Sequence, residues 1–439
     1  MEHEPVTQPV PRILLVDCDA FYVQVARLED PEGAGRARLL VVGGAGGRGV
    51  VTSASYEARA YGVRSAMPTA EALRLCPEAT VVPVPRAACS ARSREVRDAL
   101  SRLSPVVQAA SIDEFYLDLT GTERLFRGES LTETAERIRR TVLDETRISV
   151  SIGGGTRRLI AKLAASRAKP AGVYVVAPGE EEAFMRELRL ADIPGIGPAF
   201  AEVLARRGLV HVRDALEVQP EWFERWFGPQ RGRWLASRIR GEDASRVDPH
   251  EPRRSISSER TFFEDRDDDA RLERTLARQA MAVAGTLRRQ GLRARTVTVK
   301  LRDHDFRTRS ASRTLPEPVE TDQAVFEVAR RLLGELRRRR RVPVRLLGVG
   351  LSGLQSEPGP HQLALFDEAE PLESDRDRTV TRVLDTLRER FGADAVVPGR
   401  VLGDAPRGGD VSSSSDGAAS PPRDERRRSA RRPPPGDAR

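Results

Sequence analysis

The sequence predicts a multidomain chain that combines α/β and α+β folds. Its 439 residues exceed what one hydrophobic core usually organises, so several domains are expected. Short apolar strand patterns alternate with amphipathic helix patterns as far as residue 152, which is typical of an α/β domain. The pattern is helical over residues 180–241, and strands and helices mix again over residues 254–352. These changes divide the chain into at least three structural regions.

The first region is predicted from short apolar runs and amphipathic repeats. Its strands are expected over residues 12–17, 39–42, 49–53 and 148–152, and its helices over 55–61, 68–75, 88–103 and 131–146. A further apolar segment, over residues 106–119, is interrupted by Asp113 and Glu114. The run Gly153-Gly-Gly-Thr156 lacks the Lys and the spacing of a phosphate-binding loop, so it is interpreted as a permissive turn.

The later regions differ in composition. A tight turn over residues 194–197 precedes an expected helix over 199–207, and the polar, proline-bounded stretch 243–252 is interpreted as a linker. In the last α+β region, helices are expected over 270–290 and 322–338, and strands include 296–302 and 344–351. A final amphipathic helix is expected over 377–391. Beyond residue 403 the chain is rich in Ser, Pro and Arg, so we expect disorder there.

Composition excludes several classes of protein. Hydrophobic residues make up 39% of the chain, but no apolar run approaches the roughly 20 residues that cross a bilayer. The first residues lack the pattern of a secretion signal. Cys18, Cys76 and Cys89 are too widely spaced for a disulfide framework or a zinc site. We therefore expect a cytoplasmic protein without membrane spans, whose metal ions, if it binds any, are held by carboxylates.

Positive charge is concentrated in the last α+β region. The whole chain has 73 Lys or Arg and 65 Asp or Glu, a formal net charge of +8. Residues 253–355 alone contain 24 basic and 14 acidic residues, a net charge of +10. A basic module of this kind favours a polyanion, so nucleic acid is the expected partner.

Two pairs of acidic residues interrupt apolar strand patterns and give the strongest indication of chemistry. Asp17 and Asp19 end the first strand, and Asp113 and Glu114 interrupt the segment 106–119. Ionised side chains are costly in buried strands unless they are paired or bind metal. If one sheet brings both pairs together, their oxygens suit Mg²⁺ or Mn²⁺, and paired ions suit phosphoryl transfer. The alternative is that each Asp merely caps a strand or turn.

Three other side chains suit a bound triphosphate. Tyr56 offers a hydroxyl, Arg59 a guanidinium fork and Lys162 an ammonium group. Each of these residues alone fits a solvated helix face at least as well.

Two patterns suit DNA phosphates. Gly195 and Gly197 lie in a helix-hairpin-helix pattern, whose turn presents backbone N–H groups, although a plain helical hairpin is the alternative. An uninterrupted basic run at a helix end comprises Arg337, Arg338, Arg339, Arg340 and Arg341. Such a run is usually a solvated face, but within a basic module we expect it to contact phosphates.

A short apolar motif lies in a loop bounded by Pro and Gly. Its residues are Gln362, Leu363, Ala364, Leu365 and Phe366. Exposed apolar side chains on such a loop suit a hydrophobic groove of a partner protein. The alternative is a strand packed on its own domain.

Taken together, these motifs resemble a Y-family translesion DNA polymerase of the bacterial DNA polymerase IV type over residues 10–366. The matching segments, in order, are VDCDAFY (16–22), SYEARAYGV (55–63), SIDEFYLD (111–118), IAKLAASRAKP (160–170), PGIG (194–197) and VRLLGVGLS (344–352). The QLALF segment (362–366) is similar to the family's sliding-clamp-binding motif.

The resemblance implies a right-hand polymerase with an α+β palm, small fingers, an all-α helix-hairpin-helix thumb and an α+β little finger. The implied bounds are palm 1–20 and 87–174, fingers 21–86, thumb 175–242, linker 243–252 and little finger 253–356. A clamp-binding loop and terminal helix (357–402) and a disordered tail (403–439) would follow.

The resemblance also implies roles for individual residues. Asp17, Asp113, Glu114 and the backbone carbonyl of Cys18 would bind two Mg²⁺ ions, with Mn²⁺ as the alternative metal. The incoming triphosphate would be held by Tyr56, Arg59 and Lys162. Tyr22 would be the steric gate against ribonucleotides, with Phe21 as its packing neighbour.

Four positions depart from the family pattern: Arg157-Arg158 stand in place of Asn and Lys, Gly154 replaces a β-branched residue, and Ser166 replaces a common Asp. The implied function is low-fidelity, template-directed translesion synthesis on primer–template DNA, without proofreading, by a monomer recruited by the sliding clamp. The alternative is a non-catalytic repair scaffold that binds DNA and clamp. Three mutually repelling acids argue against that scaffold, because it would not need them.

Overall fold

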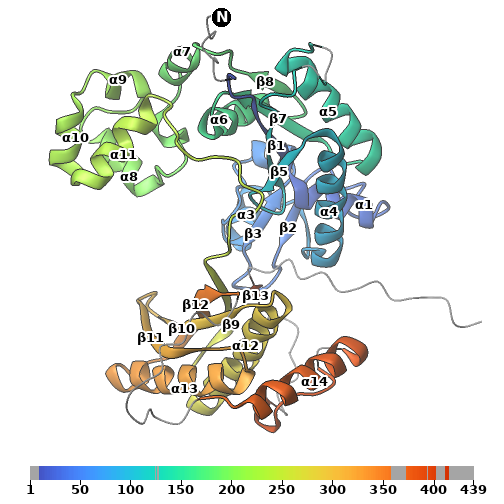
Figure 1. The fold of residues 1–439 in the computed structure, drawn as a ribbon, viewed down its shortest axis with the longest axis vertical. Coiled ribbons are helices and arrows are strands. Elements are labelled where there is room, and N and C mark those ends of the chain that lie inside the picture. The colour runs from blue at the N-terminus through green and yellow to red at the C-terminus, as the bar shows by residue number, and fades with distance from the viewer. Residues whose placement is uncertain are drawn as a thin grey trace, which may run out of the picture.

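A computed structural model contains three sheets, each packed with helices, and the strands of the smallest sheet are inserted in the chain between the first and second strands of a larger one (Figure 1). The structure describes residues 9–123, 125, 128–356, 372–392 and 394–401, and the backbone of residues 411–414. Within this part of the chain, no helix is both long enough and apolar enough to span a bilayer.

The first sheet has five strands in the order β5-β6-β1-β7-β8. Its strands are β1 (Ile13–Cys18), β5 (Val106–Ala109), β6 (Glu114–Asp118), β7 (Val150–Gly155) and β8 (Val173–Val175). One face packs against α1 (Phe21–Glu29), α4 (Arg86–Leu103) and α5 (Leu131–Thr146) in a core that includes Val16, Leu100 and Ile138. The other face packs against α6 (Arg158–Ala168). The segment predicted as one apolar stretch over 106–119 is thus a hairpin of two strands.

The glycine run after residue 152 is strand, not turn. Gly153 lies in β7, and a Cβ atom there would come within 2.0 Å of Ala165 N and 2.2 Å of Ala161 O. Helix α6 therefore packs directly on the backbone of β7, which only glycine permits. The prediction of a turn was wrong because a strand without side chains shows no apolar alternation.

The second sheet is small and has the order β3-β2-β4. Its strands are β2 (Leu40–Gly43), β3 (Val51–Ala54) and β4 (Thr80–Val82), and the helices α2 (Tyr56–Ala60) and α3 (Thr69–Leu75) belong to the same region. Helix α1 lies between this sheet and the first: Phe21 packs in the first core, whereas Val23 packs with Leu40 and Val42.

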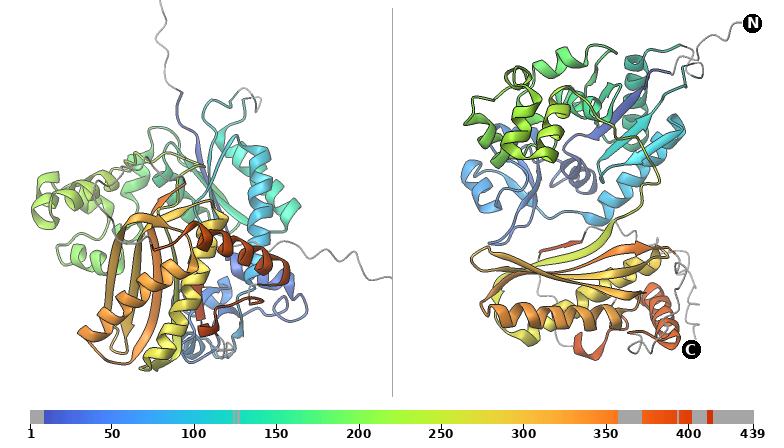
Figure 2. Two further views of the ribbon diagram at one scale, coloured as in Figure 1. Left: turned by 60° about the horizontal axis from the view of Figure 1, so that its bottom comes forward. Right: turned by 60° about the vertical axis from the view of Figure 1, so that its left-hand side comes forward.

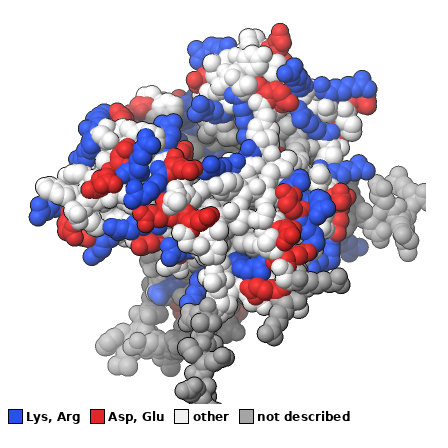
Figure 3. Space-filling model, turned by 90° about the horizontal axis from the view of Figure 1, so that it is seen from above, with Lys and Arg blue, Asp and Glu red and all other residues white. Residues whose placement is uncertain are grey.

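A helical region follows. It contains α7 (Glu181–Arg186), α8 (Pro198–Ala205), α9 (Val212–Leu216), α10 (Pro220–Phe227) and α11 (Pro229–Ile239), and it lies to one side of the first sheet (Figure 1). The surface that is visible when the molecule is viewed from above carries basic and acidic side chains interspersed with one another (Figure 3). The excess of positive charge is therefore not concentrated there.

Hydrogen bonds attach the predicted linker, residues 243–252, to the region of the first sheet. Leu159 N donates to Asp243 Oδ2 at 3.1 Å, and Arg158 Nη1 donates to Arg246 O at 2.8 Å. Farther along, Asp248 N donates to Gln108 Oε1 at 3.1 Å. Of the two arginines that depart from the family pattern, Arg158 thus fastens the linker, and Arg157 donates to Gly241 O, just before the linker, at 3.2 Å.

The last sheet has the order β11-β10-β12-β9-β13. Its long strands are β9 (Ser255–Arg266), β10 (Arg293–Asp303), β11 (Thr308–Val319) and β12 (Val344–Gln355). The helices α12 (Asp269–Arg289) and α13 (Asp322–Arg339) cover the face turned away from the other two sheets (Figures 1 and 2). The opposite face of the sheet is left open toward the rest of the molecule.

The tail contributes one strand. Val411–Ser414 (β13) pairs antiparallel with β9, with Val411 opposite Thr261. The expectation of a wholly disordered tail therefore does not hold for these residues. The rest of residues 403–439 lies outside the described part.

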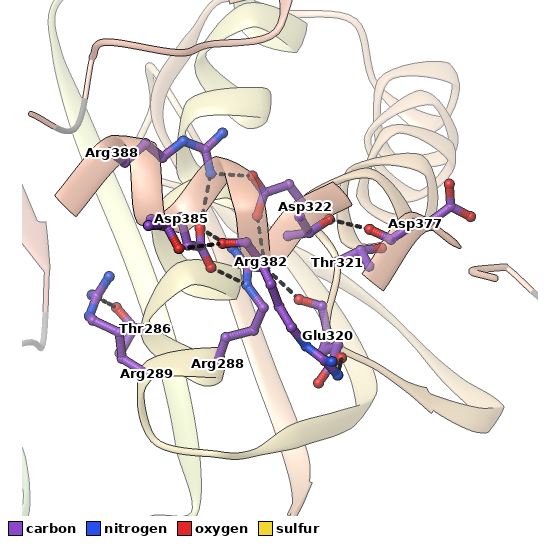
Figure 4. A network of polar contacts seen from close by, with 12 residues as sticks. Thr286, Arg288, Arg289, Glu320, Thr321, Asp322, Asp377, Arg382, Asp385 and Arg388 are labelled. Atoms are coloured by element: carbon purple, nitrogen blue, oxygen red, sulfur yellow. Dashed lines mark hydrogen bonds and ion pairs between the residues drawn. The ribbon is translucent and has the colours of Figure 1, made fainter. Parts of the chain in front are cut away.

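The last helix, α14 (Asp375–Phe391), is attached mainly by ion pairs. Arg288 contacts Asp322 and Asp385, and Arg388 contacts the same two carboxylates from α14 (Figure 4). The helix begins two residues before its predicted start because the side chain of Ser374 caps it.

Candidate active site

The pairing of β1 with β6 gathers the predicted carboxylates at one end of the first sheet. The antiparallel register sets Asp17 opposite Glu114, and Cys18 N donates to Asp113 O at 2.9 Å. Asp113 lies in the turn between β5 and β6 rather than on a strand, and Ser111 hydrogen-bonds its side chain. Residues nearly a hundred positions apart in sequence thus meet at this sheet edge.

Two lysines of the α6 segment balance the carboxylates. Lys169 Nζ lies 2.7 Å from Asp17 Oδ1, and Lys162 Nζ contacts Glu114 Oε1. Burial raises the pKa of Asp17, which is 5% exposed, while the charge of Lys169 opposes that rise. Sequence reasoning missed Lys169, although it stands in the quoted segment 160–170 only seven positions after Lys162.

The donor chemistry of the cluster fits hard divalent cations. Asp17, Asp113 and Glu114 supply carboxylate oxygens, and each lysine contact shows that positive charge is favourable beside them. In the described part of the chain, however, no three Asp, Glu, His or Cys side chains are arranged to hold a metal ion. Ammonium groups occupy the positions beside Asp17 and Glu114, so the predicted cage is not formed in this structure.

The thiol of Cys18 takes no part in this chemistry. Burial, and then the nearby charge of Asp113, raise its pKa well above the usual value. The thiol therefore stays protonated. The contact that Cys18 makes with the carboxylate cluster comes from its backbone, whose N–H donates to Asp113 O.

Tyr56 and Arg59 form one unit on α2. The Tyr56 hydroxyl donates to Asp19 Oδ1 at 3.1 Å, and the Arg59 guanidinium lies 4.8 Å from the centroid of the Tyr56 ring. Burial, and then Asp19, raise the pKa of Tyr56, which keeps the phenol neutral and able to donate. Lys162, predicted to hold the triphosphate together with this pair, contacts Glu114 in this structure, and its role at the triphosphate stays a prediction.

Tyr22 and Phe21 open helix α1. Phe21 is 1% exposed and belongs to the core, whereas Tyr22 is half-buried, and their rings meet edge-on with centroids 5.6 Å apart. Burial, and then the charge of Asp113, raise the pKa of Tyr22. The phenol of Tyr22 is therefore within electrostatic reach of the carboxylates.

Comparison with known proteins decides what this arrangement is. The model of the impB/mucB/samB family matches residues 16–166, and that of its C-terminal domain matches residues 253–365. DNA polymerase IV of Caulobacter vibrioides is 36% identical over 388 residues, 88% of this chain and 93% of the relative. DNA polymerase IV of Halorhodospira halophila is 40% identical over 345 residues, 78% of this chain and 95% of the relative.

Solved structures agree with these relatives. A Dbh–Dpo4 chimera described as a Y-family DNA polymerase superposes with a TM-score of 0.70 at 27% identity, covering 78% of this chain and 98% of the other. DinB from Sulfolobus solfataricus gives a TM-score of 0.55 over the same shares. The chain belongs to the Y family of DNA polymerases. It is a DNA-directed DNA polymerase of the translesion type, and the alternative of a non-catalytic scaffold finds no support.

The expected architecture of this polymerase is confirmed. The first sheet is the palm, the small second sheet belongs to the fingers, the helical region is the thumb, and the last sheet with its two helices is the little finger. The carboxylates and both lysines lie in the palm, and Tyr56 and Arg59 reach it from the fingers.

The predicted DNA contacts of the polymerase form two groups, the glycines of the thumb turn and the basic run of the little finger. Gly195 and Gly197 lie in the thumb turn, where Gly195 has a φ of 100° and a Cβ atom would come within 2.6 Å of the Trp234 ring. Gly197 directly precedes α8. This turn is apart from the carboxylates, on the thumb side of the molecule (Figure 1).

The basic run of the little finger differs from the prediction. Arg337 is 5% exposed, and its guanidinium contacts Asp267 and Asp269, both at 2.6 Å. Arg340 pairs with Asp303 and Asp305. Arg337 is thus an internal structural residue, which corrects its expected role as a phosphate contact, whereas Arg340 is only half-buried and its contact with phosphates stays a prediction. Arg338, Arg339 and Arg341 are exposed.

Sequence reasoning missed the open face of the little-finger sheet. Along β10, Val297, Val299 and Leu301 are buried toward the helices, so the alternate residues Thr298 and Lys300 belong to the open face. The period-two alternation of apolar and polar residues over 296–302 was the available signal. The clamp motif, Gln362 to Phe366, lies outside the described residues.

Proposed function

We propose that the palm carboxylates are the nucleotidyl-transfer site, acting on primer–template DNA and deoxynucleoside triphosphates. The observation that carries this proposal is the β1–β6 register, which sets Asp17 opposite Glu114, together with the hydrogen bond from Cys18 N to Asp113 O. With the Cys18 carbonyl, these residues would hold two Mg²⁺ ions, or Mn²⁺ as the alternative. Such a pair, when bound, stabilises the attacking and leaving oxygens of an in-line displacement at phosphorus.

The basic groups around the carboxylates would receive the triphosphate. Lys162 and Lys169 already lie against Glu114 and Asp17, so phosphates seated there meet two ammonium charges. From the fingers, Tyr56 offers a hydroxyl and Arg59 a guanidinium. Tyr22 would lie beneath the sugar, because it opens the helix that directly follows the metal-binding strand.

DNA would lie between the thumb and the little finger. The N–H groups of the Gly195–Gly197 turn suit a backbone phosphate. The open sheet face of the little finger presents small polar side chains and Lys300, and Arg338, Arg339 and Arg341 add exposed positive charge. Contacts of this kind bind phosphates without reading sequence.

The domain bounds implied by the motifs remain our assignment: palm 1–20 and 87–174, fingers 21–86, thumb 175–242, linker 243–252 and little finger 253–356. We further propose a cytoplasmic monomer that Gln362, Leu363, Leu365 and Phe366 recruit to the sliding clamp.

Primer extension tests the proposal. Asp17→Ala, Asp113→Ala or Glu114→Ala should abolish extension in Mg²⁺ while leaving primer–template affinity nearly unchanged, because thumb and little finger supply the affinity. A matched control is Asp118→Ala, which removes another carboxylate of β6 from the opposite end of the strand and should leave extension measurable. Full extension by Asp113→Ala would contradict the assignment.

A further inference from the structure

Asp19 lies at a hydrogen-bond junction that joins three segments of the palm and fingers. It is 4% exposed. Its Oδ1 accepts hydrogen bonds from Ser151 Oγ at 2.7 Å and from the Tyr56 hydroxyl at 3.1 Å. Its Oδ2 accepts from Ser149 Oγ and from the backbone N–H of Ala171, both at 3.0 Å. One buried carboxylate therefore has four donors.

This junction separates Asp19 from metal binding. An ionised carboxylate has about four acceptor sites, and here four donors engage it. Asp17, two residues earlier, has the Lys169 ammonium as its partner instead. The two aspartates of the VDCDAFY segment therefore have different roles.

The four donors come from parts of the chain that must act together. Tyr56 begins α2 in the fingers, and Ser149 and Ser151 lie at the start of β7 in the palm. Ala171 lies in the turn two residues after Lys169, with a left-handed φ of 53°. That conformation is unfavourable for a residue other than glycine, so the bond from Ala171 to Asp19 helps to hold the turn.

The backbone of Asp19 is fixed as well. Asp19 N donates to Ser149 O at 3.0 Å, and Gln24 donates to the carbonyl oxygen of Asp19. Gln24 also accepts from Ser149 N at 2.7 Å. The carboxylate of Asp19 is thus held in one position, and its hydrogen bonds fix the positions of the Tyr56 hydroxyl and of the turn that follows Lys169.

We propose that Asp19 is a positioning residue for the incoming nucleotide, which holds the Tyr56 hydroxyl and the Lys169 turn in the geometry that the triphosphate requires. The inference rests on the proposed role of Tyr56 at the triphosphate. The Tyr56 hydroxyl has one proton, which goes to Asp19 here. In the free enzyme this hydrogen bond holds the phenol in place before the nucleotide binds. When the hydroxyl then donates to a phosphate oxygen instead, Asp19 keeps three donors and no buried acceptor is left unpaired.

The test is steady-state extension by Asp19→Asn. The amide has one acceptor oxygen, and the Ala171 N–H can only donate, so that oxygen would face Ala171 and the NH₂ group would take the place of the oxygen that accepts from the Tyr56 hydroxyl. We expect the KM for the nucleotide to rise on the order of tenfold, the worth of about one well-made hydrogen bond, with primer–template affinity unchanged. Asp19→Ser, whose hydroxyl is too short to reach Tyr56, serves the same purpose if the Asn variant does not fold.

A matched control and a double variant separate positioning from stability. Ser151→Ala removes one palm donor from Asp19 but keeps the bonds to Tyr56 and Ala171, so it should lower the melting temperature and leave KM within about twofold. Tyr56→Phe should raise KM in the wild-type chain and add nothing further in the Asp19→Asn background, because the misplaced hydroxyl no longer contributes.

The outcomes are distinguishable. If Tyr56→Phe alone leaves KM unchanged, the proposed role of Tyr56 fails. If Tyr56→Phe raises KM but Asp19→Asn does not, or if the two effects multiply, Asp19 does not act through Tyr56 and the inference is overturned. A rise in KM for Ser151→Ala as large as that for Asp19→Asn would reduce Asp19 to a structural residue.

Discussion

Tyr22 is half-buried and close enough to Asp113 for that carboxylate to raise its pKa. A ring in this position can exclude a 2′-hydroxyl by contact. We predict that Tyr22→Ala stays folded and raises ribonucleotide incorporation relative to deoxynucleotide incorporation by about tenfold or more. Competition assays with matched ribo- and deoxynucleotides measure the ratio.

The opposite view is that Tyr22 is an ordinary core residue. In that case Tyr22→Ala would open a cavity and cost ~3–5 kcal/mol of stability. Phe21→Ala is the useful comparison, because Phe21 is fully buried and should show that loss. An unchanged ribo-to-deoxy ratio in a folded Tyr22→Ala variant would remove the gate assignment.

Neighbouring arginines of the basic run serve different purposes. Arg337 is buried between Asp267 and Asp269, whereas Arg338 is exposed at the next position. We predict that Arg337→Ala lowers the free energy of unfolding by about 2 kcal/mol, because charge-assisted hydrogen bonds and packing are lost together. Arg338→Ala should leave stability unchanged and weaken DNA binding, with a shallower dependence on salt. Chemical denaturation and DNA titrations at several salt concentrations distinguish the two variants.

At the scale of elements, the contact of α6 with β7 positions both lysines that pair with the palm carboxylates. The backbones meet at Gly153, where a Cβ atom would lie 2.0 Å from Ala165 N. We predict that Gly153→Ala destabilises the palm by about 3 kcal/mol and reduces extension, because α6 must shift. Gly154→Ala is the control: its Cβ atom would meet only the side chains of Leu14 and Val175, both at 2.9 Å, which can adjust. Equal losses in the two variants would contradict this account.

Long amphipathic elements were predictable from the sequence, and close packing was not. The helix expected over 131–146 is α5 without change, and α12 and α13 match within a residue or so, because their apolar faces repeat with helical period. The carboxylate set was also predictable, since acids within apolar strands are unusual. The identity of the second lysine was not, because only the packing of α6 brings Lys169 to Asp17. Arg337 was misassigned because its acidic partners lie about 70 positions earlier in the chain.

At the scale of the whole molecule, recruitment and catalysis should be separable. Residues 362–366 lie between the little finger and α14, outside the elements that carry the active site. We predict that deleting them removes stimulation of synthesis by the sliding clamp and leaves clamp-independent extension unchanged. Extension assays with and without clamp measure both quantities. Unchanged stimulation would mean that this segment is not the clamp contact.

The fastened linker changes how thumb and little finger share one DNA duplex. A free tether would let the little finger sample a large volume, and its local concentration at the duplex would be low. Here Leu159, Arg158 and Gln108 hold the linker to the palm at three points, so little slack chain is left. If the thumb and the little finger both bind DNA, as proposed, the second of the two domains binds in an almost intramolecular step once the first has bound. Two weak, sequence-independent contacts would thereby become bivalent binding. The strength of that binding would depend on how firmly the linker is held to the palm, and not on any added phosphate contact.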